Sequence, residues 1–203
     1  MPRTHPTKAK LVETFLALAA QGNFDKVTVD DVLDKSGISK GSLYHHFVNF
    51  DDPIAEAMAQ NYAEGVDRSI EQMTGALLGC SSKEQFMEGV RLSILGTIAP
   101  GSAGFRLNRA RIIGMCANNP RLEAKVAAEQ ARLSRAIEDL FREGQKQGWL
   151  KPSLHIPAAA LLVQAYTLGK VVDDIAPEPV DQNAWIELIS NLVETLFISE
   201  ERT

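Results

Sequence analysis

The sequence has two cysteines, few aromatic residues and no long apolar run. Cys80 and Cys116 are too few and too far apart for a disulfide framework or a zinc cluster. The most apolar stretch, 156–172, is interrupted by Gln164 and Lys170, which argues against a membrane-spanning helix. The N-terminus also lacks the apolar segment of a secretion signal. We therefore predict a cytoplasmic protein with no membrane partner, no metal site and no cofactor.

Charge is distributed unevenly along the chain. The net charge of −5 argues against a protein that coats nucleic acid along its whole surface. The first 50 residues hold six basic and five acidic side chains, and the remaining residues hold 15 basic and 21 acidic ones. Three of the four histidines also lie in the first 50 residues. A mildly basic N-terminal segment on an acidic body fits a local contact with DNA.

Apolar residues recur with a helical period through almost the whole chain, and strand signals are nearly absent. The sequence therefore predicts an all-α protein of about nine helices. Their approximate ranges, with the caps that flank them, are 7–21, 28–37, 39–47, 51–78, 83–98, 103–118, 121–147, 158–175 and 182–198.

The segment 28–47, TVDDVLDKSGISKGSLYHHF, predicts two short helices joined by a tight turn. Thr28 can cap the first helix, with Asp31 completing a capping box, and Ser39 can cap the second. Gly37 permits the positive φ that a sharp reversal needs. Apolar residues would form a miniature core that fixes the angle between the helices: Val29, Val32, Ile38, Leu43 and Phe47.

The other side of the second short helix is polar. Its hydrogen-bonding side chains are Ser39, Lys40, Ser42, Tyr44, His45 and His46. Such groups can reach phosphate oxygens and base edges, and Gly41 would let the DNA backbone approach closely. The arrangement is that of a helix-turn-helix, whose second helix enters the major groove. Two alternatives are that Tyr44 is an ordinary core aromatic and that His45 and His46 are metal ligands.

The string ISKGSLYHHF resembles the recognition-helix signature of the TetR family, and the similarity extends over roughly residues 7–58. The resemblance implies a helix-turn-helix domain at 1–50 and a helical ligand-sensing and dimerisation domain at 51–203. It assigns Thr28, Tyr44 and His45 to phosphates, and Lys40, Gly41 and Ser42 to positions near the bases. Arg3 would reach the minor groove. The predicted DNA-binding set is Arg3, Thr28, Ser39, Lys40, Gly41, Ser42, Tyr44, His45, His46 and Asn49.

The sequence departs from the family pattern at two places. The family often has a Ser-Lys-Glu string after the recognition helix, and this chain has Asn49, Phe50 and Asp51 there. A phosphate contact made by that lysine would be missing. Leu33 stands where the family usually has a small alanine, so the two short helices would pack slightly wider apart.

The last two predicted helices are apolar on more than one side, which a monomer surface would not tolerate. The TetR resemblance implies that they form a homodimer, and two-fold symmetry implies a palindromic operator. The alternative is that they are buried within one subunit.

The middle helices would enclose a cavity for an unknown small-molecule effector. Its candidate lining residues are Phe86, Phe105, Arg109, Met115, Cys116, Gln164 and Tyr166, with Arg106 added for an anionic ligand. The alternative is that each of these residues belongs to the ordinary core or surface and contacts no ligand.

The function predicted from these features is a transcriptional regulator, a repressor that a small molecule releases from DNA. A helical protein-interaction module and an activator without a small-molecule inducer are the alternatives. An enzyme would need Cys116 as nucleophile and His155 as base, but neither lies in a catalytic motif. We predict that the protein is not an enzyme.

Overall fold

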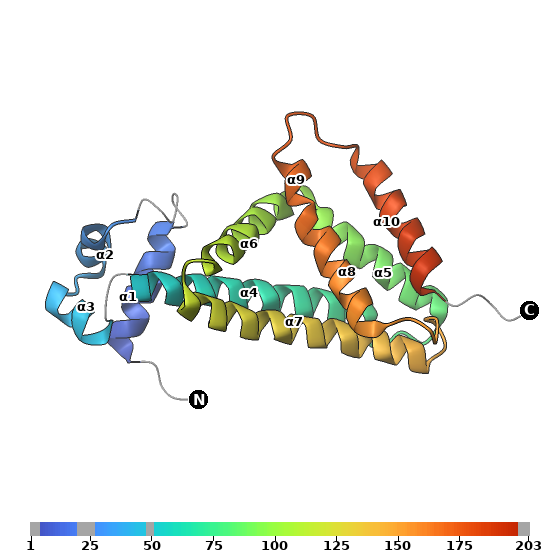
Figure 1. The fold of residues 1–203 in the computed structure, drawn as a ribbon, viewed down its shortest axis with the longest axis horizontal. Coiled ribbons are helices and arrows are strands. Elements are labelled where there is room, and N and C mark those ends of the chain that lie inside the picture. Colours follow the sequence, from blue (N-terminus) through green and yellow to red (C-terminus); the bar gives the residue numbers. More distant parts are fainter. Residues whose placement is uncertain (1–4, 20–26, 48–50, 199–203) are drawn as a thin grey trace, which may run out of the picture. The chain divides into compact units, whose positions relative to one another are not determined.

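The computed structural model describes residues 5–19, 27–47 and 51–198, and they form helices joined by short loops (Figure 1). Within these ranges there is no strand, only an isolated bridge between Leu150 and Ile198. The predicted all-α class is confirmed. The helices are α1 Pro6–Ala19, α2 Val29–Ser36, α3 Lys40–His46, α4 Asp51–Leu77, α5 Lys83–Ile98, α6 Ala103–Cys116, α7 Pro120–Lys146, α8 Ile156–Gly169, α9 Val171–Asp174 and α10 Gln182–Phe197; a short 3₁₀ turn, Pro100–Ser102, precedes α6.

The eighth predicted helix differs most from the structure, and the sixth ends at Cys116 instead of Asn118. The eighth was expected as one helix over 158–175, but it is divided at Gly169 and Lys170 into α8 and the single turn α9. Glycine is a poor helix former, and the Lys170 ammonium pairs with Asp173 in the new turn. The helix also begins earlier than expected, because His155 caps it and Pro157 fits its first turn.

By packing, the chain divides into two compact units, 1–64 with 115–126 and 65–114 with 127–203. The helices α4, α6 and α7 each contribute to both units, so the units do not follow chain order. The functional boundary predicted after residue 50 stays a prediction, since packing units and functional domains need not coincide.

In the first unit, the core gathers around α1. Its buried face consists of Leu11, Val12 and Phe15, as the period of the sequence predicts. Helices α2 and α3 pack on α1 and bury Val32 and Leu43. Burial of such side chains stabilises the fold by about 1.5–3 kcal/mol each. Because α2 and α3 are short, their orientation depends on this shared core more than on helix propensity.

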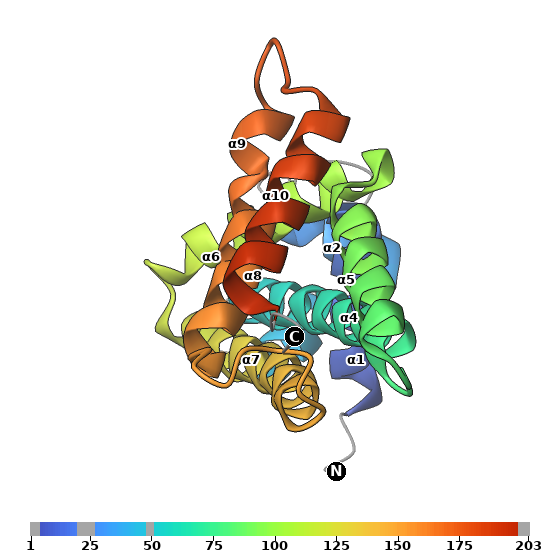
Figure 2. The same ribbon diagram turned by 90° about the vertical axis from the view of Figure 1, so that its right-hand side faces the viewer.

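In the second unit, α5 lies beside α10 (Figure 2) and also passes very close to α4. A Cβ built on Gly89 would lie 2.2 Å from the backbone oxygen of Ala76, so only glycine fits at this crossing. The unit buries Phe86, Phe141 and Phe197 among aliphatic side chains. None of the described helices is long and apolar enough to cross a membrane.

Candidate functional site

The start of α2 has the capping box that the sequence predicts. The Asp31 backbone N–H donates to Thr28 Oγ1 at 3.2 Å, and the Thr28 backbone N–H donates to Asp31 Oδ2 at 2.9 Å. Hydrogen bonds from the Thr28 hydroxyl and backbone lower the pKa of the Asp31 carboxyl. The capping box fixes the first turn of α2, and α2 in turn supports α3, the helix that follows it.

The turn between α2 and α3 depends on Gly37 and on a serine that the sequence analysis missed. Gly37 has φ 66°, in the left-handed region, and its N–H donates to Leu33 O at 2.9 Å. The buried Ser36 hydroxyl accepts from the Ile38 N–H at 3.2 Å and donates to Leu33 O. A serine at the last position of a helix before glycine can bond local backbone in this way, which was the available signal. Ser39 then caps α3 by accepting from the Ser42 N–H at 3.2 Å.

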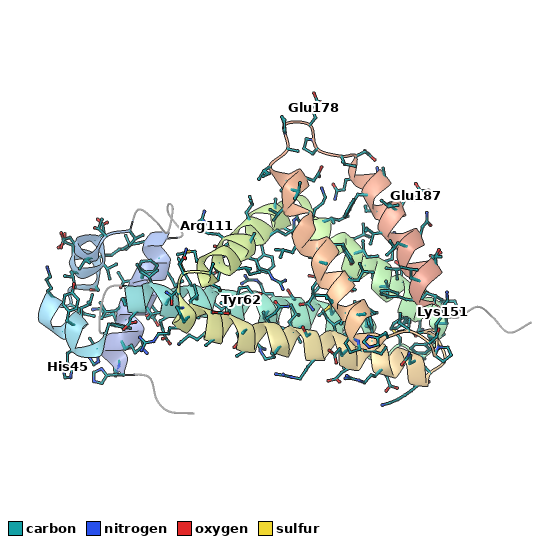
Figure 3. All side chains as sticks on the ribbon, viewed as in Figure 1. His45, Tyr62, Arg111, Lys151, Glu178 and Glu187 are labelled. Carbon is teal, nitrogen blue, oxygen red and sulfur yellow. The ribbon has the colours of Figure 1, made fainter. Side chains whose placement is uncertain are left out.

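The predicted DNA-contacting face of α3 is open to solvent. Tyr44 is 45% exposed, which excludes the alternative that it is a core aromatic. Lys40, Gly41 and His45 are also exposed, and Figure 3 shows the His45 side chain pointing outward from α3. Two more members of the predicted set, Ser39 and Thr28, are exposed, and Ser42 and His46 are half-buried. Arg3 and Asn49 lie outside the described residues, as does Phe50.

Three histidines meet beside α3. The ring centroids of His5 and His46 are 4.4 Å apart, and those of His45 and His46 are 5.2 Å apart. Partial burial of His46 and repulsion from His5, His45 and Lys8 lower its pKa. In the part of the chain that the structure describes, no group of three or more His, Cys, Asp or Glu side chains is arranged to hold a metal ion. The three rings therefore lie together beside α3, and the lowered pKa of His46 disfavours its charged form.

Inside the second unit lie two cavities that share part of their walls. One, called here the polar chamber, has a volume of about 80 Å³. The other, the apolar chamber, has a volume of about 50 Å³. Both are lined by Met73, Ser93, Ile137, Val163 and Tyr166. The polar chamber adds Ser69, Gln72, Thr97, Arg109, Leu133, Gln164 and Thr167, and the apolar chamber adds Leu77, Phe86, Val90, Ile94, Leu140, Phe141, Leu150, Val193, Phe197 and Ile198.

A hydrogen-bonded chain crosses the wall of the polar chamber. Arg109 donates to Gln130 Oε1 at 3.0 Å, and the Gln130 amide in turn donates to Gln164 Oε1. The buried Gln164 donates to Ser134 Oγ and to the Ala160 carbonyl, both at 3.2 Å. Burial raises the pKa of the neighbouring Tyr166 to about 12, so its hydroxyl stays protonated. These linked groups hold the polar side chains at the wall in fixed orientations.

Of the seven predicted ligand residues, the structure brings four to the chamber walls: Phe86, Arg109, Gln164 and Tyr166. The other three, Phe105, Met115 and Cys116, are not among the lining residues of either chamber. Phe105 packs over Gly65, and the Arg68 guanidinium lies 5.3 Å from its ring centroid. Arg106, considered for an anionic ligand, is buried in a two-bonded ion pair with Asp174, both bonds at 2.6 Å.

Two larger hollows lie at the surface of the second unit. One, of about 570 Å³, lies between α5 and α10, and the other, of about 700 Å³, lies between the ends of α4 and α7. Charged side chains such as Arg91 and Glu88 line the first, where they pair with each other at 2.9 Å. Open charged grooves are common on protein surfaces, whereas ligand sites are mostly apolar with a few oriented polar groups. The inner chambers match that description better.

The last helices carry large apolar side chains that face solvent in this single chain. Leu161 on α8 is 65% exposed and Leu188 on α10 is 58% exposed. Val172, Ile175 and Leu196 are also exposed. The alternative that these helices are wholly buried within the subunit is therefore excluded for these faces. Exposed apolar side chains in such number are typical of a protein–protein interface.

Comparison with known proteins supports the assignment of the N-terminal segment. Residues 11–52 match the model of the tetR family of bacterial regulatory proteins. The HTH-type transcriptional regulator UidR of Escherichia coli strain K12 is 21% identical over 179 residues, which cover 88% of this chain and 86% of UidR. Residues 11–52 of this chain are therefore similar to the DNA-binding segment of the tetR family of bacterial regulatory proteins.

Solved structures of transcriptional regulators share the fold of this chain over nearly its whole length. GusR of Salmonella enterica superposes with a TM-score of 0.67 at 18% identity, over 95% of this chain and 97% of GusR. A regulator from Saccharomonospora viridis, solved in complex with choline, has a TM-score of 0.68 at 16% identity, over 95% and 98% of the two chains. At such identities the likeness concerns the fold, and the sites need arguments of their own.

Proposed function

We propose that this chain is a repressor of the TetR type, which binds a palindromic operator as a homodimer and leaves it when a small molecule fills the inner chambers. The exposed polar face of α3, on a turn fixed by Gly37 and two side-chain caps, is the observation that supports DNA binding most strongly. We expect the protein to act in the cytoplasm, where its DNA is.

On the DNA, Lys40, Gly41 and Ser42 would lie nearest the bases, because they form the first turn of α3. Tyr44, His45 and Thr28 would bond phosphates, and Ser39 and His46 would support them. Arg3 and Asn49 complete the proposed set. Phosphate contacts give most of the affinity and set the register, and contacts with the base edges give the specificity.

The homodimer would form through α8, α9 and α10, whose exposed leucines and valine are described above. A two-fold axis there would present two α3 helices to half-sites about 34–36 Å apart. A single helix-turn-helix makes few contacts, so pairing supplies the affinity that one subunit lacks.

Release would follow if the ligand binds better to a conformation whose α3 helices do not fit the operator spacing. A ligand can shift such an equilibrium only by its difference in affinity for the two states. The small volumes of the chambers, about 80 and 50 Å³, support this, because the chambers would have to widen to admit a ligand.

To test DNA binding, sites are first selected from a random palindromic library and then titrated by fluorescence anisotropy at several salt concentrations. We expect sequence preference and a steep fall of affinity with salt, because bound phosphates release counterions. Lys40→Ala should weaken binding by about 1–3 kcal/mol and relax the preference at the base pair that Lys40 contacts. Lys10→Ala, an exposed lysine of α1 outside the proposed set, is the matched control. Equal affinity for selected and random sites would contradict the proposal.

An activator without an inducer would show the same DNA binding, so a reporter assay is needed to distinguish it. Expression of the reporter gene would then increase with the amount of protein and would not respond to the ligand. A protein-interaction module would show no preference for the selected sites.

The environments of His155 and Cys116, the two residues that a catalytic role would need, argue against catalysis. His155 Nδ1 accepts the Ala158 N–H as a helix cap, and burial with the nearby Glu123 raises the pKa of the Cys116 thiol.

A further inference from the structure

The serine and threonine hydroxyls around the polar chamber have each given their hydrogen to their own helix. Four such groups line this chamber, those of Ser69, Ser93, Thr97 and Thr167. Each donates to a backbone carbonyl three or four residues earlier, and the accepting carbonyls are those of Gly65 at 3.0 Å, Gly89 at 2.9 Å, Ile94 at 2.7 Å and Val163 at 2.8 Å. A hydroxyl has one hydrogen and two lone pairs. The four groups can therefore accept a hydrogen bond from a ligand but have no hydrogen left to donate.

The nitrogen donors at the same wall are already engaged. Gln164 gives both of its amide hydrogens to Ser134 Oγ and the Ala160 carbonyl. The Arg109 guanidinium donates to Gln130. The Gln72 amide nitrogen packs against Gly96 of α5, where a Cβ would overlap it. Tyr166 differs from these groups, because burial raises its pKa to about 12 and its hydroxyl keeps a hydrogen.

The walls also determine which charge a ligand can carry. Within the described part of the chain, no aspartate or glutamate lines either chamber. An ammonium group buried there would lose its hydration without a carboxylate partner. A carboxylate has no hydrogen to donate, so its oxygens would face the lone pairs of the wall hydroxyls. A neutral hydroxyl suits the wall better, since it can donate to a wall oxygen and accept from Tyr166.

The apolar chamber fits a hydrocarbon body. Among the described residues that line it, only Ser93 and Tyr166 carry a hydroxyl, and both belong to the wall that it shares with the polar chamber. The other lining side chains are aliphatic, aromatic or thioether groups, including Phe86 and Phe141. A ligand whose body lies in this chamber would therefore direct its polar end to the shared wall.

We propose that the effector is a neutral, largely apolar hydroxyl compound, an alcohol or phenol, whose hydroxyl donates to Ser93 Oγ and accepts from the Tyr166 hydroxyl. Its hydrocarbon body lies in the chamber lined by Phe86 and Phe141. This inference rests on the proposed function only in taking the chambers as the effector site.

The test compares four probes that share one aromatic ring and differ in their polar group: benzyl alcohol, anisole, benzoate and benzylamine. Benzyl alcohol and anisole are isomers, but the anisole oxygen can only accept a hydrogen bond. A single ring suits small chambers, since an apolar cavity of about 150 Å³ takes up benzene. Affinities for the full chain are measured by isothermal titration calorimetry.

We expect benzyl alcohol to bind about threefold to tenfold more tightly than anisole, because only the alcohol gains the hydrogen bond to Ser93. Benzoate and benzylamine should bind at least about tenfold more weakly than benzyl alcohol, because each buries a charge that the walls do not pair.

Two variants locate the hydroxyl of the ligand. Ser93→Ala removes the proposed acceptor and should weaken benzyl alcohol binding by about threefold to tenfold while leaving anisole binding unchanged. Tyr166→Phe removes the proposed donor and should weaken binding of both isomers, since both carry an accepting oxygen. Thr14→Val is the matched control. The Thr14 hydroxyl also donates to a carbonyl of its own helix, that of Lys10 at 2.8 Å, but Thr14 lines neither chamber.

Anisole binding as tightly as benzyl alcohol, tighter binding of benzoate or benzylamine, or no binding of any probe would overturn the proposal. A Ser93→Ala protein that keeps the full preference for benzyl alcohol would do the same. DNA titrations separate these outcomes from failure of the proposed function. A protein that binds its selected DNA but none of the probes refutes only the ligand chemistry. A protein that binds benzyl alcohol through Ser93 but has no DNA preference refutes the repressor and leaves the ligand chemistry standing.

Discussion

At the scale of single residues, the helix-turn-helix combines strict backbone requirements with freely exposed side chains. Gly37 must adopt a positive φ, and Ser36 and Thr28 satisfy backbone groups at the two ends of α2. Tyr44 and Lys40 make no comparable demand on the fold, because both are exposed. Substitutions of Gly37, Ser36 or Thr28 should therefore affect stability, and substitutions of Tyr44 or Lys40 should affect DNA binding.

Tyr44→Phe should weaken binding to a selected operator by about five- to tenfold, since one hydrogen bond to phosphate is worth about 1 kcal/mol. Its thermal midpoint should stay that of the wild type, because the ring is exposed. Tyr62→Phe, at a buried tyrosine of α4, is the control and should leave operator affinity unchanged. Anisotropy titrations and thermal melts measure the two effects. A Tyr44→Phe protein that melts early would show that the hydroxyl is structural.

His46 should make stability depend on pH. Its pKa lies below the ordinary 6.5, so the unfolded chain takes up the proton first as the pH falls. The free energy of unfolding should therefore decrease as the pH drops through about 6.5 and stop changing below the lowered folded-state pKa. His46→Gln should flatten this part of the profile. Urea unfolding between about pH 8 and about pH 5 measures it; identical slopes in the two proteins would rule out this role.

At the scale of elements, short helices are held by specific partners from elsewhere in the chain. The single turn α9 is tied to α6 by the Arg106–Asp174 ion pair, whose side chains are 4% and 6% exposed. Arg106 also donates to the carbonyl of Thr97, which lines the polar chamber. A chain of contacts thus joins the chamber wall to the turn that carries the exposed Val172.

Arg106→Met should lower the free energy of unfolding by about 3–5 kcal/mol, because it leaves a buried carboxylate without its partner. The double variant Arg106→Met with Asp174→Leu should recover much of that loss, since both charges are then removed. Chemical denaturation of the three proteins gives the values. If the double variant were no more stable than the single one, packing and not charge would explain the effect.

At the scale of the whole molecule, the proposed homodimer depends on the exposed apolar faces of α8 and α10. Leu161→Glu and Leu188→Glu should each convert the dimer to a monomer, because a charge would be buried at the contact. Affinity for a palindromic site should fall at least about tenfold, as each subunit then binds alone. Light scattering during gel filtration reports the mass.

The matched control for the dimer is Leu78→Glu, at a leucine that is 70% exposed and lies outside α8–α10. It should remain dimeric and bind DNA as the wild type does. A monomeric wild type, or a Leu161→Glu variant that stays dimeric, would show that these helices are not the interface.

Much of the fold could be predicted from the sequence because its signals are local. Each of these signals acts within a few residues. They are the caps at Thr28 and Ser39, the glycine that ends α2 at Gly37, and the apolar period of α5. The break at Gly169 was missed, because the pairing of Lys170 with Asp173 and of Arg106 with Asp174 outweighs the apolar period that continues through it. The chambers were only partly predicted, since a periodic apolar residue lines a cavity or fills the core depending on its neighbours.

The sequence by itself determined the all-helical class, most helix ends and the polar face of α3, because hydrogen bonds and side-chain spacing along one chain suffice for these. Only the tertiary structure decided which side chains meet around the chambers, and it placed Arg109 and Gln164 there while Phe105 packs over Gly65. The physical reason is that cavity walls arise where helices distant in sequence cross, and each crossing depends on the packing of all the others.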